Sequence, residues 1–294
     1  MSIVIFTDEP ATQGGWHGMQ LASALAIRDF DSVFISLKDC AIELSDDLSF
    51  NQPIIQILNL KSLPKAAFVR GIAGGTLQQI TSRLNILHTL KMLGVTVYND
   101  GRAIERTVDK TMTSFLIHNA GIATPKTWVC ESRQQAHAIV QKNMALNQKL
   151  VIKPLFGSQG QGVRQVTKSL PLPGDKFVDG VFYLQKLIEA THDYRVFVVN
   201  KKAVCAMKRI GETWLHNVAQ GAECEQIAET DVLAIACQAS LVLDIAYCGV
   251  DVIRDADGKL YVLEVNSIPS WRGLQSVTDI NIAQVLVDDL LRLI

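Results

Sequence analysis

The chain has 294 residues and a formal net charge of −1, from 28 Lys and Arg side chains against 29 Asp and Glu side chains. Apolar residues make up 48% and charged residues 19%, which is typical of a globular protein with enough core for two or three domains. Because the charges balance, nothing draws the whole chain to nucleic acid or to an anionic membrane, and we expect neither as a partner.

Cysteine and histidine usage argues against zinc and disulfides. The six cysteines are scattered without a C-x-x-C pair, as expected of reduced thiols in a cytoplasmic protein. None of the six histidines has H-E-x-x-H spacing. Residues 1–8 are too acidic for a signal peptide and indicate a first strand, and no apolar run reaches the roughly 20 residues that span a bilayer. We therefore expect a cytoplasmic location.

The first 100 residues alternate short apolar runs with helical periodicity, which predicts an α/β domain built on a parallel sheet. Strands are expected at Ile3–Thr7, Ser32–Leu37, Ala66–Arg70 and Thr96–Asn99, and helices at Met19–Arg28 and from Ile80 to Leu93. Two glycine-rich stretches, at 13–18 and 70–75, do not match G-x-G-x-x-G, so a nicotinamide site is disfavoured. Both stretches are read as structural loops, although Arg70 at a strand end could reach an anionic ligand.

The middle of the chain pairs a lysine with a glycine-rich loop. After an expected hinge at 100–102, residues 107–110 open a helix that Gly121 ends, and Ser132 opens another. A strand at 149–154 then ends in Lys153, and three glycines follow within 157–162. Free backbone N–H groups in such a loop suit phosphate, although a simple turn is the commoner explanation. The lysine precedes the glycines, so this is not a G-x-x-x-x-G-K-[ST] loop.

The last third begins with an apolar strand at 181–189 and a hairpin of 193–199 with 203–207, followed by Arg209. Residues 211–229 form the least regular part of the chain. Helical spacing returns at 232–243 and from 280 to 294.

Two acidic strands, 249–253 and 260–266, are expected to form a hairpin across a turn at 255–258. Side chains alternate along a strand, so Glu264 and Asn266 share a face and the turn brings Asp251 beside them. Carboxylates among apolar residues need a partner, and three hard oxygen donors favour a divalent cation. The alternative is that Asp251 is a polar residue next to a turn and that Glu264 pairs with a buried arginine.

These motifs, in this order, resemble the ATP-grasp superfamily and within it the RimK-like carboxylate–amine ligases, over roughly residues 100–290. The resemblance implies an α/β (α+β) ATP-grasp fold. It also implies three units, a pre-ATP-grasp domain at 1–100, a central subdomain with the glycine loop at 101–182, and a C-terminal subdomain with the metal strands at 183–294.

The resemblance also implies roles for individual residues. For ATP it implies Lys110, Lys153, Gly157, Ser158, Gln159, Gly160, Gly162, Gln185, Lys186, Leu187, Asp193 and Asn217; for metal, Asp251, Glu264 and Asn266; for catalysis, Arg209. Arg70, Arg195, Trp271 and Arg272 are the candidates for substrate binding. Trp271 and Arg272 could form a stacking surface and a carboxylate clamp, or Trp271 could pack while Arg272 is solvated.

The implied reaction joins a carboxylate to an amine, with glutamate as the expected amine, through an acylphosphate, ATP and one or two Mg²⁺ or Mn²⁺ ions. The segment after the second acidic strand is similar to RimK-like ligases of tetrahydromethanopterin-linked cofactor pathways. A homo-oligomer is also implied. Two alternatives stay open on the same fold, a non-catalytic ATP-binding regulatory protein and a kinase that stops at the phosphorylated product.

Overall fold

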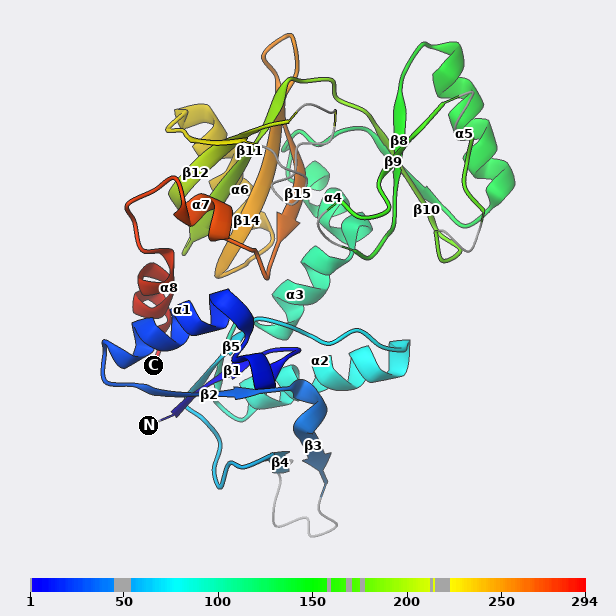
Figure 1. Cartoon of the computed structure of the whole chain (residues 1–294). Helices are drawn as coiled ribbons and strands as arrows, with labels where there is room; N and C mark the ends of the chain where they lie inside the picture. The colour runs from blue at the N-terminus through cyan, green and yellow to red at the C-terminus, as the bar shows by residue number, and fades with distance from the viewer. Residues whose placement is uncertain are drawn as a thin grey trace.

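The structure is a computed structural model that describes residues 2–44, 54–157, 160–167, 171–174, 178–211, 214 and 223–294. Within these residues the chain forms a four-stranded parallel sheet, a four-stranded and a five-stranded antiparallel sheet, and a two-stranded hairpin. The parallel sheet lies below the two antiparallel sheets in Figure 1. No helix among the described residues is long and apolar enough to cross a membrane.

The N-terminal sheet has the order β2-β1-β5-β6 and is covered by helices on both faces. Along β1, Ile3 and Ile5 pack on the side of α1, whereas Val4 and Phe6 pack on the side of α2. Its elements are β1 (Ser2–Phe6), α1 (Gly15–Ala26), β2 (Asp31–Ile35), β5 (Ala66–Val69), α2 (Leu77–Met92) and β6 (Thr96–Tyr98). The predicted α/β domain with a parallel sheet is confirmed.

Three features of this region differ from expectation. The glycine-rich stretch at 13–18 is not a loop throughout, because α1 already begins at Gly15. The hairpin of β3 (Cys40–Glu43) and β4 (Ile54–Ile57) was not predicted. Two short 3₁₀ helices, at Pro10–Thr12 and Leu37–Asp39, follow β1 and β2.

The hinge expected at 100–102 is wrong, because Asp100 caps a helix there. Its carboxylate accepts a hydrogen bond from the backbone N–H of Ala103 (2.8 Å), and α3 (Gly101–Val108) follows. A separate helix, α4 (Lys110–Asn119), is capped by Asp109, whose carboxylate accepts from the Thr111 N–H (2.8 Å). The helix expected from 107 is therefore two helices.

The central sheet has the order β7-β10-β8-β9 and packs against α5. Its elements are β7 (Thr127–Cys130), α5 (Arg133–Ala145), β8 (Leu150–Lys153), β9 (Arg164–Val166) and β10 (Phe182–Lys186). Ser132 caps α5 as predicted, accepting from the Gln135 N–H (3.3 Å).

The C-terminal sheet has the order β13-β12-β11-β14-β15. One face packs against α6, while part of the other joins α1 and α8 in a core that includes Phe197 and Tyr247. Its elements are β11 (His192–Val199), β12 (Lys202–Ile210), β13 (Glu223–Gln226), α6 (Thr230–Val242), β14 (Tyr247–Arg254), β15 (Leu260–Asn266), α7 (Arg272–Gln275) and α8 (Ile282–Leu291). The stretch expected to be irregular thus contains β13.

The C-terminal helix α8 returns to the N-terminal domain and lies beside α1 (Figure 1). Arg28 at the end of α1 forms an ion pair with Asp288. The Tyr98 hydroxyl at the end of β6 donates to Asp289 of α8 (2.6 Å). The first and last parts of the chain therefore share one core.

Candidate active site

The two acidic strands pair as the sequence predicts. Asp251 of β14 lies directly opposite Glu264 of β15, and Gly249 lies opposite Asn266. The turn between the strands is closed by a hydrogen bond from the Gly258 N–H to the Asp255 carbonyl (3.0 Å). Asp251, Glu264 and Asn266 therefore share one face of the sheet.

Asp251 is held by two arginines. Its Oδ1 lies 2.6 Å from Nε of Arg195 and 3.1 Å from Nη2 of Arg209. Nη2 of Arg195 also donates to Oδ2 (3.1 Å). Buried arginines therefore pair with Asp251, whereas the alternative had expected one beside Glu264. Glu264 has no ion pair among the described residues.

Asp193 binds the other side of Arg209. Its two carboxylate oxygens accept from Nε (2.6 Å) and Nη2 (2.8 Å) of Arg209. Both side chains are buried, and the pKa of the Arg209 guanidinium is raised because the attraction of Asp251 and Asp193 outweighs the opposing effect of burial. This geometry favours a role for Asp193 in positioning Arg209 over the expected direct contact with nucleotide.

Strand register explains why these four charges meet. Asp193 and Arg195 are two apart on β11 and share a face; Arg209 is opposite Asp193 on β12, and Asp251 is opposite Arg195 on β14. Gly249 leaves room for this arrangement, since a Cβ there would lie 2.5 Å from Nη1 of Arg195.

Two lysines approach the acidic strands. Nζ of Lys110, in the first turn of α4, donates to the Gly157 carbonyl (2.9 Å). Nζ of Lys153, at the end of β8, donates to Oε1 of Gln185 (2.7 Å). Burial lowers the pKa of both lysines, and the nearby negative charge of Glu264 opposes that effect. The structure thus brings both lysines within electrostatic reach of Glu264.

The side chain of Gln185 accepts the hydrogen bond from Lys153 and is held in place by neighbouring hydroxyl groups. It is 1% exposed, and its Nε2 donates to the hydroxyls of Thr127 (3.0 Å) and Tyr183 (3.2 Å). The Tyr183 hydroxyl lies 2.7 Å from that of Ser114 on α4. No sequence pattern predicts this network, because its members come from separate elements.

The remaining nucleotide candidates lie in two segments. The backbone N–H groups of Lys186 and Leu187 donate to the carbonyls of Lys126 (2.8 Å) and Lys149 (2.9 Å). In the glycine-rich loop, Gly157, Gly160 and Gly162 have φ values of 143°, 70° and 72°, which favour glycine. Ser158 and Gln159 of that loop, and Asn217, lie outside the described residues.

The acidic strands fit a magnesium ion by their chemistry. Among the residues that the structure describes, no three His, Cys, Asp or Glu side chains cluster as a metal site. The candidate set is two carboxylates and an amide, which are oxygen ligands, and Mg²⁺ bound with a nucleotide takes its other ligands from phosphate and water. The Glu264 carboxylate is half-buried and has no ion pair among the described residues, so its negative charge would stabilise a cation beside it.

The substrate candidates Arg70 and Trp271 contact each other, and Trp271 packs against Phe197 on the same face of the sheet as Arg195 and Asp251. Trp271 is 0% exposed, so the expectation of a stacking surface is wrong and the packing alternative holds. The Arg70 guanidinium lies 4.6 Å from the centre of the Trp271 ring, and its Nη2 donates to the Pro269 carbonyl (3.0 Å). Arg272, the first residue of α7, is exposed.

His17 of α1, which sequence reasoning missed, holds this segment. Its Nε2 accepts a hydrogen bond from the Trp271 N–H (3.1 Å), and its ring packs edge-on against Trp271. Burial, together with the charges of Arg70 and Arg272, lowers the pKa of His17 to about 4. His17 is therefore neutral near pH 7, as an acceptor must be.

This shift predicts a pH-dependent stability. The folded pKa lies below the unfolded value of 6.5, so the contribution of His17 is complete above 6.5 and is lost as the pH falls towards 4. The loss is at most about 1.4 kcal/mol per pH unit in that window. Urea unfolding across this range should show a steeper fall for wild type than for His17→Gln, whose amide oxygen can accept the same bond without titrating. An equal dependence of unfolding free energy on pH in the two proteins would contradict this role of His17.

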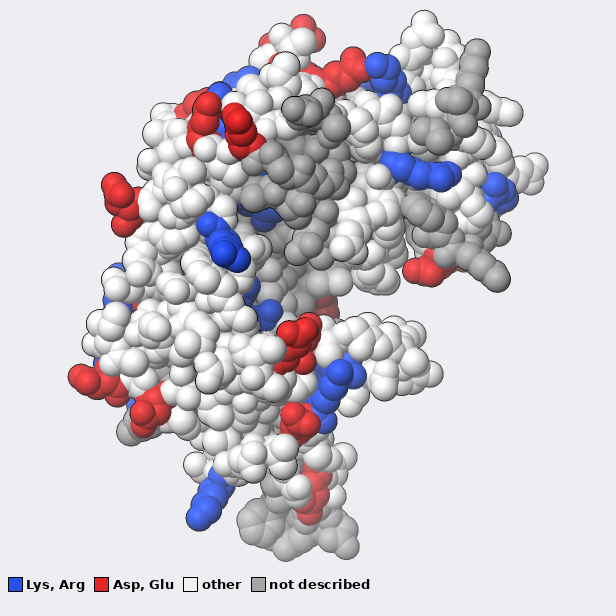
Figure 2. All heavy atoms as spheres, viewed as in Figure 1, with Lys and Arg blue, Asp and Glu red and all other residues white. Residues whose placement is uncertain are grey.

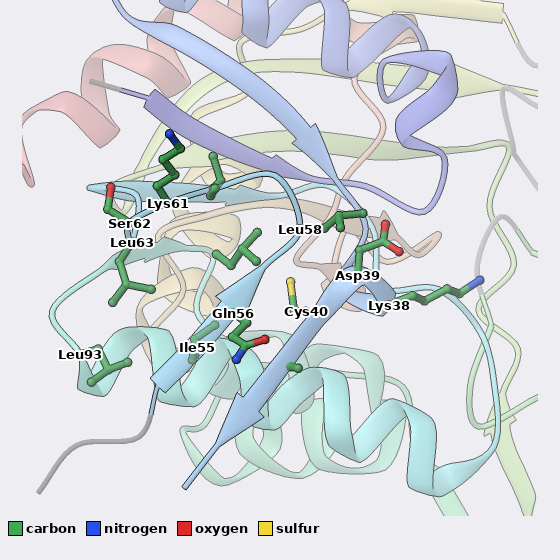
Figure 3. Close-up of a pocket in the computed structure, with 13 residues that line it drawn as sticks. Lys38, Asp39, Cys40, Ile55, Gln56, Leu58, Lys61, Ser62, Leu63 and Leu93 are labelled. Atoms are coloured by element: carbon green, nitrogen blue, oxygen red, sulfur yellow. The ribbon is translucent and has the colours of Figure 1, made fainter. Parts of the chain in front are cut away.

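A separate hollow of about 840 Å³ lies beside the β3–β4 hairpin and contains none of the predicted site residues (Figure 3). Its lining is mainly apolar, with Lys38, Asp39 and Lys61 among the polar side chains. On the face of the molecule that Figure 2 shows, Lys and Arg side chains border the hollow at the centre of the view.

Comparisons with known proteins agree with this geometry. The ATP-grasp ligase PsnB, in a structure with minimal precursor, Mg and ADP, superposes with a TM-score of 0.71 at 18% identity, covering 99% of this chain and 97% of that chain. The D-cycloserine synthetase DcsG superposes with a TM-score of 0.72 at 17% identity, covering both chains completely. The fold is therefore that of ATP-grasp ligases.

Sequence comparison identifies the family. The model of the RimK-like ATP-grasp domain matches residues 107–290. A tetrahydromethanopterin:alpha-L-glutamate ligase of Methanococcus maripaludis is 33% identical over 287 residues, covering 94% of each chain. The chain belongs to the RimK-like ATP-grasp family, and the predicted family is confirmed.

Proposed function

We propose that this chain is an ATP-dependent ligase that joins the amino group of L-glutamate to a carboxylate of a small-molecule acceptor. The observation that carries the proposal is the approach of Lys110 and Lys153 to Glu264, which lies opposite Asp251 on the paired acidic strands. The relative from M. maripaludis is named for tetrahydromethanopterin and alpha-L-glutamate, and a pterin-linked carboxylate is accordingly our first candidate acceptor.

In this proposal the nucleotide lies between the lysines and the acidic strands. Lys110 and Lys153 bind its phosphates beside the glycine-rich loop, and Asp251, Glu264 and Asn266 would hold one or two Mg²⁺ ions, which would neutralise phosphate charge. One opposite-charge pair at about 4 Å contributes on the order of 4 kcal/mol at an effective dielectric near 20, before desolvation. The remaining proposed nucleotide contacts are Gly157, Ser158, Gln159, Gly160, Gly162, Gln185, Lys186, Leu187 and Asn217, with Asp193 acting through Arg209.

The chemistry has two steps. An oxygen of the acceptor carboxylate attacks the γ-phosphorus of ATP, the bond to the bridging oxygen breaks, and ADP leaves. The glutamate nitrogen then attacks the acylphosphate carbonyl, loses a proton, and phosphate leaves with the C–O bonding electrons. Bound magnesium neutralises phosphate charge in this scheme.

Arg209 and Arg195 supply fixed positive charge next to the reacting groups. Asp193 and Asp251 hold Arg209 in one orientation, so no reorganisation is needed when charge develops on the phosphoryl group. Arg195 shares Asp251 with the proposed metal site, so bound magnesium would compete with Arg195 for that carboxylate. Arg195 is the proposed contact for the acceptor carboxylate.

The test is phosphate release by the purified chain with ATP, Mg²⁺ and pairs of candidate acceptors and amino acids. A ligase releases phosphate only when both substrates are present, and mass spectrometry finds one amide per phosphate. Phosphate transfer without an amide would instead identify a kinase. Tight ATP binding without turnover across the panel would identify a regulatory protein.

Replacement of Lys153 by methionine should weaken ATP binding about 10- to 100-fold, because a buried charge-assisted contact to phosphate is lost. The fold should be unharmed, since methionine removes a charge whose burial is unfavourable. Calorimetric titration with ATP and Mg²⁺ measures this. Lys142→Met, an exposed lysine of α5, is the control, and equal affinities of the two variants would refute the role.

The resemblance supports two further parts of the proposal, a homo-oligomeric state and a cytoplasmic location. Light scattering of the purified chain and cell fractionation test them.

A further inference from the structure

Two arginines lie next to Trp271 without a described carboxylate to neutralise them, Arg70 over its ring and Arg272 as the following residue. Arg70 directly follows β5 at the carboxyl edge of the parallel sheet, and Arg272 begins α7. Both lie near enough to His17 for their charges to lower its pKa. His17 is neutral and accepts the Trp271 N–H, so it does not supply a counter-charge.

Arg70 also has unused donors. Its Nη2 donates to the Pro269 carbonyl, and the guanidinium also lies close enough to the Tyr247 hydroxyl to oppose the rise that burial causes in the pKa of Tyr247, while Nε and Nη1 are buried without a well-aligned acceptor among the described residues. A buried cationic donor without an acceptor is costly, and such a group in a native fold calls for an ion or ligand. The shape of the guanidinium fork suits a carboxylate.

The surroundings hold Arg70 in place. Its guanidinium packs over Trp271, which is itself fixed by His17 and by edge-on contact with Phe197. Anchoring of both the ring and the Pro269 carbonyl restricts the guanidinium before any ligand arrives. A preorganised cation loses less entropy on binding an anion than a flexible surface side chain does.

The position suits a substrate of the ligase. The segment 267–272, which carries Arg272 and the Pro269 carbonyl, continues directly from Asn266 at the end of β15. Ligands of open α/β sheets bind outside the carboxyl ends of the strands, which is where Arg70 lies. An anion held here is therefore close to the proposed reacting groups but on the side of the N-terminal domain.

We infer that Arg70 and Arg272 form a subsite for the carboxylates of the incoming dicarboxylic amino acid, with His17 and Trp271 as positioning residues. The inference rests on the proposed ligase function and deepens it by assigning the amine substrate to the N-terminal domain. Two carboxylates on that substrate match two arginines. The nucleotide and the acceptor remain with the lysines and the acidic strands.

Titration of L-glutamate into the full chain with ADP and Mg²⁺ tests the subsite without an acceptor. Arg272→Gln and Arg70→Gln should each weaken L-glutamate binding about 10- to 100-fold, and Arg70→Lys should recover part of the loss. ADP affinity should stay within about twofold. Arg102→Gln on α3, an exposed arginine, is the matched control and should bind L-glutamate like wild type. Thermal unfolding verifies that each variant is folded.

Turnover then separates this inference from the function itself. With an acceptor that wild type uses, the variants should raise the KM for glutamate and leave the KM for ATP and for acceptor unchanged. In Arg272→Gln, a smaller preference for glutamate over glutamine would place Arg272 at the side-chain carboxylate, while an unchanged preference with both KM values raised would place it at the α-carboxylate. Unchanged glutamate binding, or a raised KM for acceptor alone, overturns the inference while the ligase function stands. If wild type formed no amide, the proposed ligase function itself would be refuted.

Discussion

Replacement of Glu264 by alanine should reduce amide formation by about 10²- to 10³-fold or more, without loss of stability. The loss is expected because the proposed metal site keeps only Asp251 and Asn266, and removal of one preorganised charge contact costs about this much in catalysis. Stability should change little, because Glu264 has no ion pair among the described residues and its repulsion by Asp251 opposes its attraction to Lys110 and Lys153.

Asp251→Ala is the matched variant and should behave differently. It should lose turnover equally, yet it leaves Arg195 and Arg209 without the carboxylate that both bind. Breaking a buried ion pair by removing one partner costs about 3–5 kcal/mol. From the sequence alone, both substitutions were expected to affect stability little, and the ion pairs change that expectation for Asp251.

Phosphate release measures the catalytic effect, and urea unfolding measures stability. Asp257→Ala, in the exposed turn between the same two strands, is the control and should change neither quantity much. An Asp251→Ala variant as stable as wild type would show that the arginine network does not hold the sheet together. An unfolded Glu264→Ala variant would mean that Glu264 has a structural partner.

Local patterns predicted the acidic hairpin, because its pairing follows from strand period and turn length alone. The pairing of Asp251 with Arg195 and Arg209 could not be predicted in the same way. It depends on the order β12-β11-β14, which places strands that are distant in the sequence side by side. The mixed role of Asp251, as candidate metal ligand and as arginine partner, is visible only after the sheet is assembled.

Two expectations from the sequence, the hinge at 100–102 and the stacking surface at Trp271, differ from the structure. The hinge expected at 100–102 is a helix start, because Asp100 is an N-cap of α3. The stacking surface expected at Trp271 is absent, because the side chains that cover Trp271 are His17 and Phe197, from other parts of the chain. Sequence neighbours predict capping well when the cap is recognised, and they predict burial poorly where the covering residues are remote.

Replacement of Asn99 by alanine should destabilise the protein by about 3 kcal/mol or more, since several buried backbone groups would lose their partner. The side chain is 0% exposed. Its Nδ2 donates to the carbonyls of Tyr247 and Ser267 (both 2.7 Å), and its Oδ1 accepts from the N–H groups of Ala246 (3.0 Å) and Tyr247 (3.2 Å). Urea unfolding measures the loss.

Asn99→Asp separates these bonds from simple packing. The aspartate keeps the shape but turns an oxygen towards two carbonyls, so its folded pKa should be raised above the usual value of about 3.9. The variant should therefore be unstable at neutral pH and recover stability as the pH falls through that raised pKa, because a protonated carboxyl can donate again. Asn85→Asp on the exposed face of α2 is the control and should show no such recovery.

The effect should reach activity as well, because Asn99 joins the N-terminal domain to both ends of the acidic hairpin. Ala246 directly precedes β14, Tyr247 begins it, and Ser267 directly follows β15. A shift of either end would move Asp251 and Glu264 relative to the lysines, and small misplacements of reacting groups are costly in catalysis. Folded Asn99→Ala, assayed well below its melting temperature, should therefore show reduced amide formation. Wild-type turnover in that folded variant would mean that the hairpin keeps its position without this link.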